Sequence, residues 1–174
     1  MCGPPVDLSF YNLSSVVGML YSASSSFLAD GYIFCPAYHS RAFRLSNNSI
    51  TDLTGLHFTL NYFLVQPSRL GWLNVSFNKI LHIDPSVQAL RVLYLHVNCI
   101  CNLSDVDKLG QLGRLTLHGN AIASENNYRR HVIAALPPLK KLDFSAVTNR
   151  ERAMVDIWCS KPHHGKTSSE NTLQ

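Results

Sequence analysis

This sequence lacks long apolar runs and is poor in charged residues. Asp, Glu, Lys and Arg together make up 15% of the 174 residues, and the formal net charge is +4. The longest apolar stretch near the start, Val16 to Leu28, is interrupted by serines and is too short to span a bilayer. A mild positive charge scattered along the chain also argues against a nucleic-acid-binding protein, which usually carries a dense basic stripe.

Cysteines are few and form no disulfide framework. Their odd number leaves at least one unpaired, and their spacing matches no known scaffold. The five are Cys2, Cys35, Cys99, Cys101 and Cys159. Because no basic-then-apolar signal peptide is visible either, we expect a cytoplasmic protein in a reducing compartment. Cys99 and Cys101 flank Ile100, and we expect them to fill small apolar spaces near a turn.

Motifs for catalysis or metal binding are missing as well. The sequence has no Gly-x-Ser-x-Gly elbow, no phosphate loop and no His-Glu-x-x-His helix. His96 and His118 are candidate metal ligands, but a zinc site needs further ligands that the pattern does not supply. We therefore predict a protein that is not an enzyme and that needs no metal or cofactor.

The sequence does contain an internal repeat with the pattern Leu-x-x-Leu-x-Leu-x-x-Asn-x-Ile. Complete copies begin at Leu90 and Leu112, and a copy with one conservative change begins at Leu70. A further copy, without the first leucine, runs from Phe43 to Ile50. A fifth, partial copy comprises Leu139, Leu142 and Phe144. Copies in register at spacings of roughly 20–29 residues are typical of leucine-rich repeats.

The repeat has a direct physical interpretation. The two leucines of Leu-x-Leu point to the same side of a short strand, so stacked copies predict a parallel β-sheet with a leucine core. The asparagine amide can bond to backbone groups in the turn that follows, which predicts a ladder along the solenoid. The ladder residues are Asn48, Asn78, Asn98 and Asn120. Their first spacing is the longest, which places an insertion within residues 56–67.

The exposed ends of a solenoid need covers. We predict a helix over residues 124–136 that begins at Ser124, then a strand over 139–144. A last helix over 148–158 is predicted from Thr148 and Glu151, which form a capping box. Met154, Ile157 and Trp158 would pack this helix over the last repeat.

The chain is thus expected to divide into three parts. Residues 1–38 form an N-terminal cap or irregular segment, with a linker at 22–26. Residues 39–159 form the leucine-rich-repeat domain with its C-terminal helical cap, and 160–174 form a mobile tail. The expected N-terminal cap residues are Leu8, Phe10, Leu13, Val16 and Val17.

The stretch from Asn120 to Asp143, with Tyr128-Arg129, Val132-Ile133 and Leu136-Pro137, resembles the C-terminal cap of the SDS22-like class of leucine-rich repeats. More narrowly, residues 92–96, 115–120 and 143–148 resemble the leucine-rich repeat-containing protein 51 family. The resemblance covers residues 41–158 and, in the N-terminal segment, only residues 4–10. The chain departs from the pattern at Val97, where a glycine is usual, and at Cys99.

This resemblance implies a non-enzymatic cytoplasmic protein. Relatives of the class often serve as scaffolds, and several work in cilia and flagella beside dynein or tubulin. Two functions stay open. The first is a scaffold in a cytoskeletal assembly such as a ciliary or flagellar axoneme, with tubulin or axonemal proteins as partners. The second is a regulatory subunit that docks on an enzyme such as a protein phosphatase. No nucleic-acid or membrane partner is expected.

Side chains between the leucines are expected on the concave face of the sheet, in three columns. The first column is Ala42, Trp72, Val92, Arg114 and Lys141; the second is Arg44, Asn74, Tyr94, Thr116 and Asp143; the third is Ser46, Ser76, His96, His118 and Ser145. Aromatic residues and arginine dominate interface hot spots. The predicted protein-binding residues are Trp72, Asn74, Tyr94, His96, Arg114, Thr116, His118 and Lys141. The alternative is that the N-terminal segment or the insertion covers Trp72.

Overall fold

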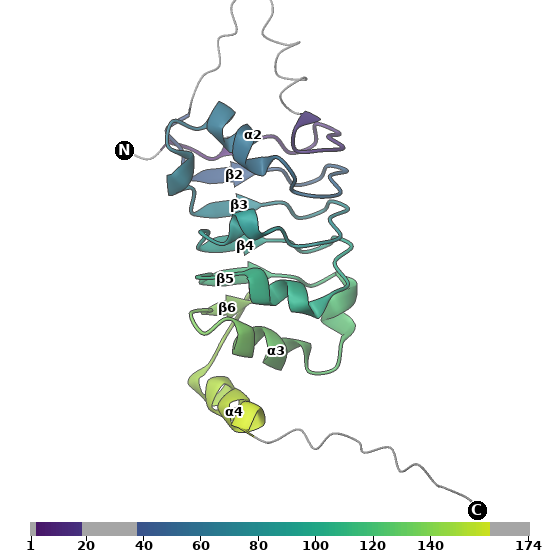
Figure 1. The fold of residues 1–174 in the computed structure, drawn as a ribbon, viewed down its shortest axis with the longest axis vertical. Helices are drawn as coiled ribbons and strands as arrows, with labels where there is room; N and C mark the ends of the chain where they lie inside the picture. Colours follow the sequence, from purple (N-terminus) through teal and green to yellow (C-terminus); the bar gives the residue numbers. More distant parts are fainter. Residues whose placement is uncertain (1–2, 19–37, 161–174) are drawn as a thin grey trace, which may run out of the picture.

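The computed structural model describes residues 3–18 and 38–160, which stack one short strand per repeat (Figure 1). In this part of the chain the strands form a single sheet in sequence order. They are β1 (Val6–Asp7), β2 (Ala42–Arg44), β3 (Trp72–Asn74), β4 (Val92–Tyr94), β5 (Arg114–Thr116), β6 (Lys141–Leu142) and β7 (Ser145–Ala146). All neighbours pair in parallel except β6 and β7, which are antiparallel.

The strand register places the repeat leucines in one buried column. Leu73 pairs with Leu93, which pairs with Leu115, which pairs with Leu142. Each of these side chains is at most 1% exposed, because each fills the space between its own strand and the returning chain. The predicted leucine-rich-repeat solenoid with a parallel sheet is therefore confirmed.

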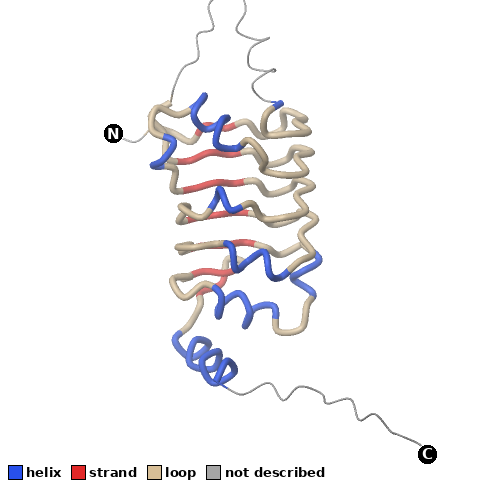
Figure 2. Tube along the Cα trace, in the orientation of Figure 1, coloured by secondary structure: helices blue, strands red, loops and turns tan. Residues whose placement is uncertain are grey.

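Helical segments alternate with the strands and return the chain to the start of the next repeat (Figure 2). The insertion predicted within residues 56–67 contains α2 (Leu56–Phe63), whose Phe63 ring meets Phe43 of β2 at a centroid distance of 5.9 Å. Short 3₁₀ turns also occur in the connections between β2 and β6. They are Pro67–Arg69, Pro85–Val87, Leu103–Lys108 and Ala121–Ser124.

The turn after each strand is tied to its neighbours by an asparagine side chain. Nδ2 of Asn98 donates to the carbonyl oxygens of Leu95 (2.9 Å) and Val75 (3.1 Å), and its Oδ1 accepts from the backbone N–H of Ile80 (3.0 Å). Asn78 and Asn120 bond to three equivalent backbone groups. Each amide thus joins two successive turns at a place where the backbone has no sheet partner.

The residue before each ladder asparagine has a left-handed backbone. The φ angles are 58° at Asn47, 55° at Phe77, 54° at Val97 and 73° at Gly119. Asparagine and glycine tolerate this region, whereas β-branched residues rarely enter it. Val97 therefore keeps the turn geometry of the other repeats at a conformational cost.

The C-terminal cap differs from the prediction at its first helix. Residues 121–124 form a separate 3₁₀ turn, and α3 (Tyr128–Ala135) begins after Asn127, whose φ is 66°. Ser124 makes no capping bond because it ends the earlier turn. The predicted packing face of α3 is correct, since Tyr128, Val132 and Ile133 are buried.

The last helix, α4 (Asn149–Ser160), begins as predicted but packs differently. Thr148 Oγ1 accepts from the Glu151 N–H (3.2 Å), and the Glu151 carboxylate accepts from the Thr148 N–H (2.8 Å). The expected packing residues Met154 and Ile157 are 53% and 56% exposed. Only Val155 is buried in α4, and the helix packs against α3.

At the other end, β1 extends the sheet, and the segment after it covers the first repeat. Leu13 and Val16 are buried as predicted, but Phe10 is 77% exposed and is not part of the cap. The expectation for Cys99 and Cys101 is also wrong. Both are exposed, because they alternate with buried Ile100 and so point away from the core. The linker at 22–26 and the tail from 161 lie outside the described residues.

Candidate concave-face interaction site

The residues predicted for the concave face come from adjacent strands in the expected register. Trp72 of β3 pairs with Val92 of β4, and Val92 pairs with Arg114 of β5, which pairs with Lys141 of β6. One step along the strands, Asn74 pairs with Tyr94. The residues between the leucines lie on one side of the sheet, the concave face.

Aromatic rings gather at the centre of the concave face. His96 and His118 stack with an interplanar angle of 8° and a centroid distance of 4.8 Å. Tyr94 contacts His96 on one side (6.2 Å) and the edge of Trp72 on the other (5.8 Å). The aromatic patch is defined as Trp72, Phe77, Tyr94, His96, His118 and Phe144. Its rings form one continuous set of contacts across four repeats.

The position of Phe144 differs from the one predicted for the fifth repeat. Sequence reasoning placed its side chain in the core and Ser145 in the third column. Instead, the chain reverses after Leu142, and Ser145 pairs antiparallel with Leu142. Both turn residues have positive φ, 48° at Asp143 and 64° at Phe144, as in the two-residue turns of hairpins.

The reversal delivers the Phe144 ring to the concave face. It is 63% exposed, yet it contacts Tyr94 (5.9 Å), His96 (5.8 Å) and His118 (5.6 Å). Sequence reasoning missed this residue because Leu-x-x-Leu-x-Phe fits the repeat, and because Asp-Phe is not a usual hairpin turn. A bulky residue in this strained conformation points to a functional site.

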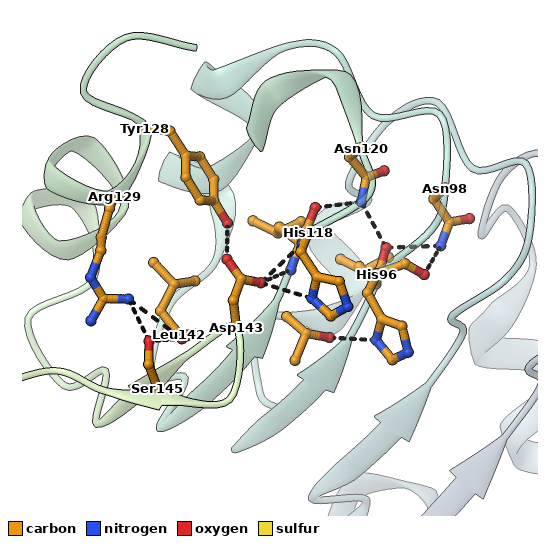
Figure 3. Close-up of polar contacts among 12 residues, drawn as sticks. His96, Asn98, His118, Asn120, Tyr128, Arg129, Leu142, Asp143 and Ser145 are labelled. Atoms are coloured by element: carbon orange, nitrogen blue, oxygen red, sulfur yellow. Dashed lines mark hydrogen bonds and ion pairs between the residues drawn. The ribbon is translucent and has the colours of Figure 1, made fainter. Parts of the chain in front are cut away.

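Asp143 holds the hairpin and the last full repeat together (Figure 3). Its Oδ1 accepts from the backbone N–H groups of Leu117 (2.7 Å) and His118 (2.9 Å), which have no further repeat to bond to. Oδ1 also lies 3.3 Å from His118 Nδ1, and Oδ2 accepts from the Tyr128 hydroxyl at 2.8 Å. Burial, with the Asp143 carboxylate beside it, raises the pKa of Tyr128.

His96 is positioned by Thr116, and its pKa is lowered by its surroundings. Its Nδ1 lies 2.8 Å from the Thr116 hydroxyl. Burial, with the neighbouring His118 ring second, lowers the pKa of His96 from its ordinary value. Thr116 itself is only 2% exposed, so it orients His96 and is not available to a partner.

Trp72 is partly covered by its own chain. The Arg44 guanidinium lies 5.5 Å from the Trp72 ring centroid, and Asp7 of β1 holds that guanidinium at 3.0 Å. The N-terminal strand therefore covers one side of Trp72 through Arg44. The remainder of the ring faces Tyr94 and solvent, so Trp72 is half-buried.

Two hollows border the aromatic patch. One, of about 430 Å³, lies between β1 and the turn of β4. Its lining includes Asp7, Arg44, Asn74, Phe77 and His96. A smaller one of about 80 Å³ lies beside Phe144 and is also lined by Tyr94, Arg114 and Lys141. Within residues 3–18 and 38–160, no three His, Cys, Asp or Glu side chains are placed to hold a metal ion. No helix in these ranges is long and apolar enough to cross a membrane.

Comparisons with known proteins agree with this geometry. A family model described as "Leucine-rich repeat" matches residues 40–170. Leucine-rich repeat-containing protein 51 of Bos taurus is 35% identical over 168 residues, which cover 89% of this chain and 84% of the relative. The Homo sapiens protein is 33% identical over the same shares. A chain in the crystal structure of the Drosophila melanogaster SNF/U2A′ complex matches with a TM-score of 0.66 and 22% identity, covering 91% of this chain and 82% of that one. At that identity the match shows the fold alone.

Proposed function

Because this chain belongs to the leucine-rich repeat family, with leucine-rich repeat-containing protein 51 among its relatives, we propose that it is a non-enzymatic scaffold that binds protein partners through its concave face. Leucine-rich repeat proteins are generally non-catalytic and present extended surfaces to other proteins. The proposed contact residues are Trp72, Asn74, Tyr94, His96, Arg114, His118 and Lys141, with Phe144 added from the structure.

The exposed aromatic patch is the observation that supports this proposal most. Phe144 is 63% exposed and Phe77 is 46% exposed, although both could be polar without loss to the core. Contiguous exposed apolar groups on a soluble domain usually mark an interaction site. The rings also brace one another, so little side-chain entropy remains to be lost on binding.

We further propose that the partners belong to a larger cytoskeletal assembly such as a ciliary or flagellar axoneme, with tubulin or axonemal proteins in contact. The protein would then act in the cytoplasm or in the cilium. The support for this step is the resemblance to scaffolds of the SDS22-like class.

Replacing Trp72 and Tyr94 together by alanine tests the binding surface. The double variant is expected to lose the partners that the wild-type chain captures in a pull-down, while its circular dichroism spectrum is unchanged. Phe144→Ala is expected to weaken capture in the same direction. Phe58→Ala is the matched control, because Phe58 is 69% exposed on α2, away from the concave face. Unchanged capture by the double variant would remove the concave face from the proposal.

The assembly is tested by fractionation of ciliated cells. Retention with axonemes after detergent and moderate salt is the expected result. Soluble, stoichiometric association with a protein phosphatase would instead favour a regulatory subunit and would contradict the axonemal assignment.

A further inference from the structure

Six basic residues gather at the edge of the sheet where the strands begin. They come from five successive repeats, which the stacking of strands brings together. They are Arg41, Arg69, Arg91, Arg114, Lys140 and Lys141, and all are exposed. These six are called the basic ridge. By contrast, Arg44, Lys108 and Arg129 each pair with a carboxylate.

Backbone hydrogen bonds fix the order of the ridge. The Gly71 N–H donates to the Arg41 carbonyl (3.0 Å), and the Arg91 N–H donates to the Gly71 carbonyl (3.0 Å). In the same way, the Gly113 N–H donates to the Arg91 carbonyl and the Lys140 N–H donates to the Gly113 carbonyl, each at 2.8 Å. Basic residues and glycines therefore alternate on consecutive strands. With strands about 4.8 Å apart, the cations of this row recur every ~10 Å over a length of ~19 Å.

The five chain segments that carry the basic ridge contain no carboxylate. Residues 38–42, 67–72, 87–92, 110–114 and 137–141 contain neither Asp nor Glu. The acidic residues between positions 52 and 125 lie instead in the connections that follow the strands. They are Asp52, Asp84, Asp105, Asp107 and Glu125. Among the described residues, no ridge side chain makes a hydrogen bond or an ion pair with another side chain, so its charge is available to a partner.

We propose that the basic ridge binds an acidic segment of a protein partner, which runs across the strands beside the aromatic patch. This proposal rests on the proposed scaffold function and names the chemistry of the partner. Arg114 and Lys141 belong to the same concave-face column as Trp72, so ridge and patch are continuous. An extended chain advances about 3.3–3.6 Å per residue, so about six residues span the ridge. Arginine guanidinium groups bind carboxylates in bidentate pairs.

A single-stranded nucleic acid is the other polyanion that a basic surface can attract, but the ring geometry disfavours it. Nucleotide bases stack on free aromatic faces. Here His96 and His118 cover each other's faces, and Arg44 lies over Trp72. The remaining ring contacts are edge-on or tilted, so no row of parallel open faces exists along this patch.

Gly71 offers a test that leaves the ridge side chains in place. A Cβ at Gly71 meets no atom within 4 Å, and its backbone is outside the left-handed region, so a larger residue fits between Arg41 and Arg91. Gly71→Glu places a carboxylate in the ridge, and Gly71→Gln adds a side chain of the same size without charge. The full-length protein would be titrated with a fluorescent peptide of about twelve glutamates, long enough to span the ridge, and followed by anisotropy.

The expected result is that wild type and Gly71→Gln bind the peptide alike, and that Gly71→Glu binds roughly three- to tenfold more weakly. Lys79→Gln lowers the net charge by the same amount at an exposed position beyond the strand ends, and is expected to change binding less than Gly71→Glu. Equal weakening by Lys79→Gln and Gly71→Glu, or no binding to wild type, would overturn the proposal.

The same titration is carried out with a uridine oligonucleotide of similar length. Tighter binding of this RNA than of the peptide, with the same sensitivity to Gly71→Glu, would assign the ridge to nucleic acid and overturn the protein partner. The Trp72 and Tyr94 pull-down separates this proposal from the scaffold function. If the double variant loses its partners but the wild-type protein does not bind the peptide, only the basic-ridge proposal is contradicted. If the wild-type protein binds the peptide but the double variant still captures its partners, only the aromatic binding site is contradicted.

Discussion

Val97 carries a backbone conformation that suits asparagine or glycine better than valine. Its φ is 54°, and the equivalent residues include Asn47 and Gly119. A left-handed backbone costs an ordinary L-residue about 1–2 kcal/mol. We expect Val97→Asn to raise the free energy of unfolding by up to about 1 kcal/mol, because asparagine tolerates this region without the extra chain entropy of glycine. Urea denaturation measures the change.

Val97→Ile is the control, since isoleucine is also β-branched and keeps the strain. The converse change, Gly119→Val, should destabilise the protein. A Cβ at Gly119 would lie 3.1 Å from the Val97 side chain and 3.3 Å from its backbone, and φ there is 73°. A lower unfolding free energy for Val97→Asn than for wild type would show that the valine contacts outweigh the strain.

The ladder asparagines differ in burial, which makes their contributions separable. Asn98 is 8% exposed and satisfies three backbone groups of two repeats. Asn98→Ala is therefore expected to cost roughly 1–3 kcal/mol of unfolding free energy, because buried N–H and C=O groups lose their partners. Asn48 is only half-buried, so water can replace its amide and Asn48→Ala should cost less. Equal losses at the two positions, measured in urea, would contradict this account.

At the scale of elements, the strands could be predicted from the sequence, and the chain reversal at the C-terminal cap could not. The period-two leucines determine which residues are buried in every repeat, so the register of β2 to β6 follows from them. Phe144 also fits that pattern, but Asp143 accepts the N–H groups that a further repeat would have bonded, and the chain turns back. This chain reversal depends on Tyr128 and α3, which are distant from it in the sequence.

The attachment of α4 should be sensitive to acid. The Arg129 guanidinium, with the Thr148 N–H second, lowers the pKa of Glu151 to about 2 from 4.5. A carboxyl group whose pKa is lower in the folded state than in the unfolded state stabilises the protein at pH values above its unfolded pKa. This stabilisation is lost as the pH falls from 4.5 toward 2. Glu151→Gln should therefore destabilise α4 at pH 7, and its deficit relative to wild type should shrink between pH 4.5 and pH 2. This deficit is measured by following helix content through urea unfolding at pH 4.5 and at pH 2. A deficit that stays constant with pH would refute the ion pair.

At the scale of the whole molecule, the sequence indicates the site only in part. The columns that hold Trp72, Tyr94 and His96 follow from the repeat, because equivalent positions stack on neighbouring strands. The basic ridge cannot be recognised from the sequence, because its residues come from different repeats and the overall charge is mild. Their common edge becomes visible only when the start of each strand is aligned with the next.

Stability should also vary along the solenoid, because each repeat gains its core from its neighbours. The N–H groups of Ile80 and Ile100 are buried at 0% exposure and bond to Asn98 and Asn120, so they can exchange only when the central repeats open together. In α4 a single buried residue, Val155, resists opening. Native-state hydrogen exchange should therefore give the two central amides the full unfolding free energy measured in urea, and α4 amides a free energy lower by at least about 2 kcal/mol. Equal protection of α4 and the central turns would mean that the cap and the repeats unfold as one unit, and the nearest-neighbour description would not apply to this chain.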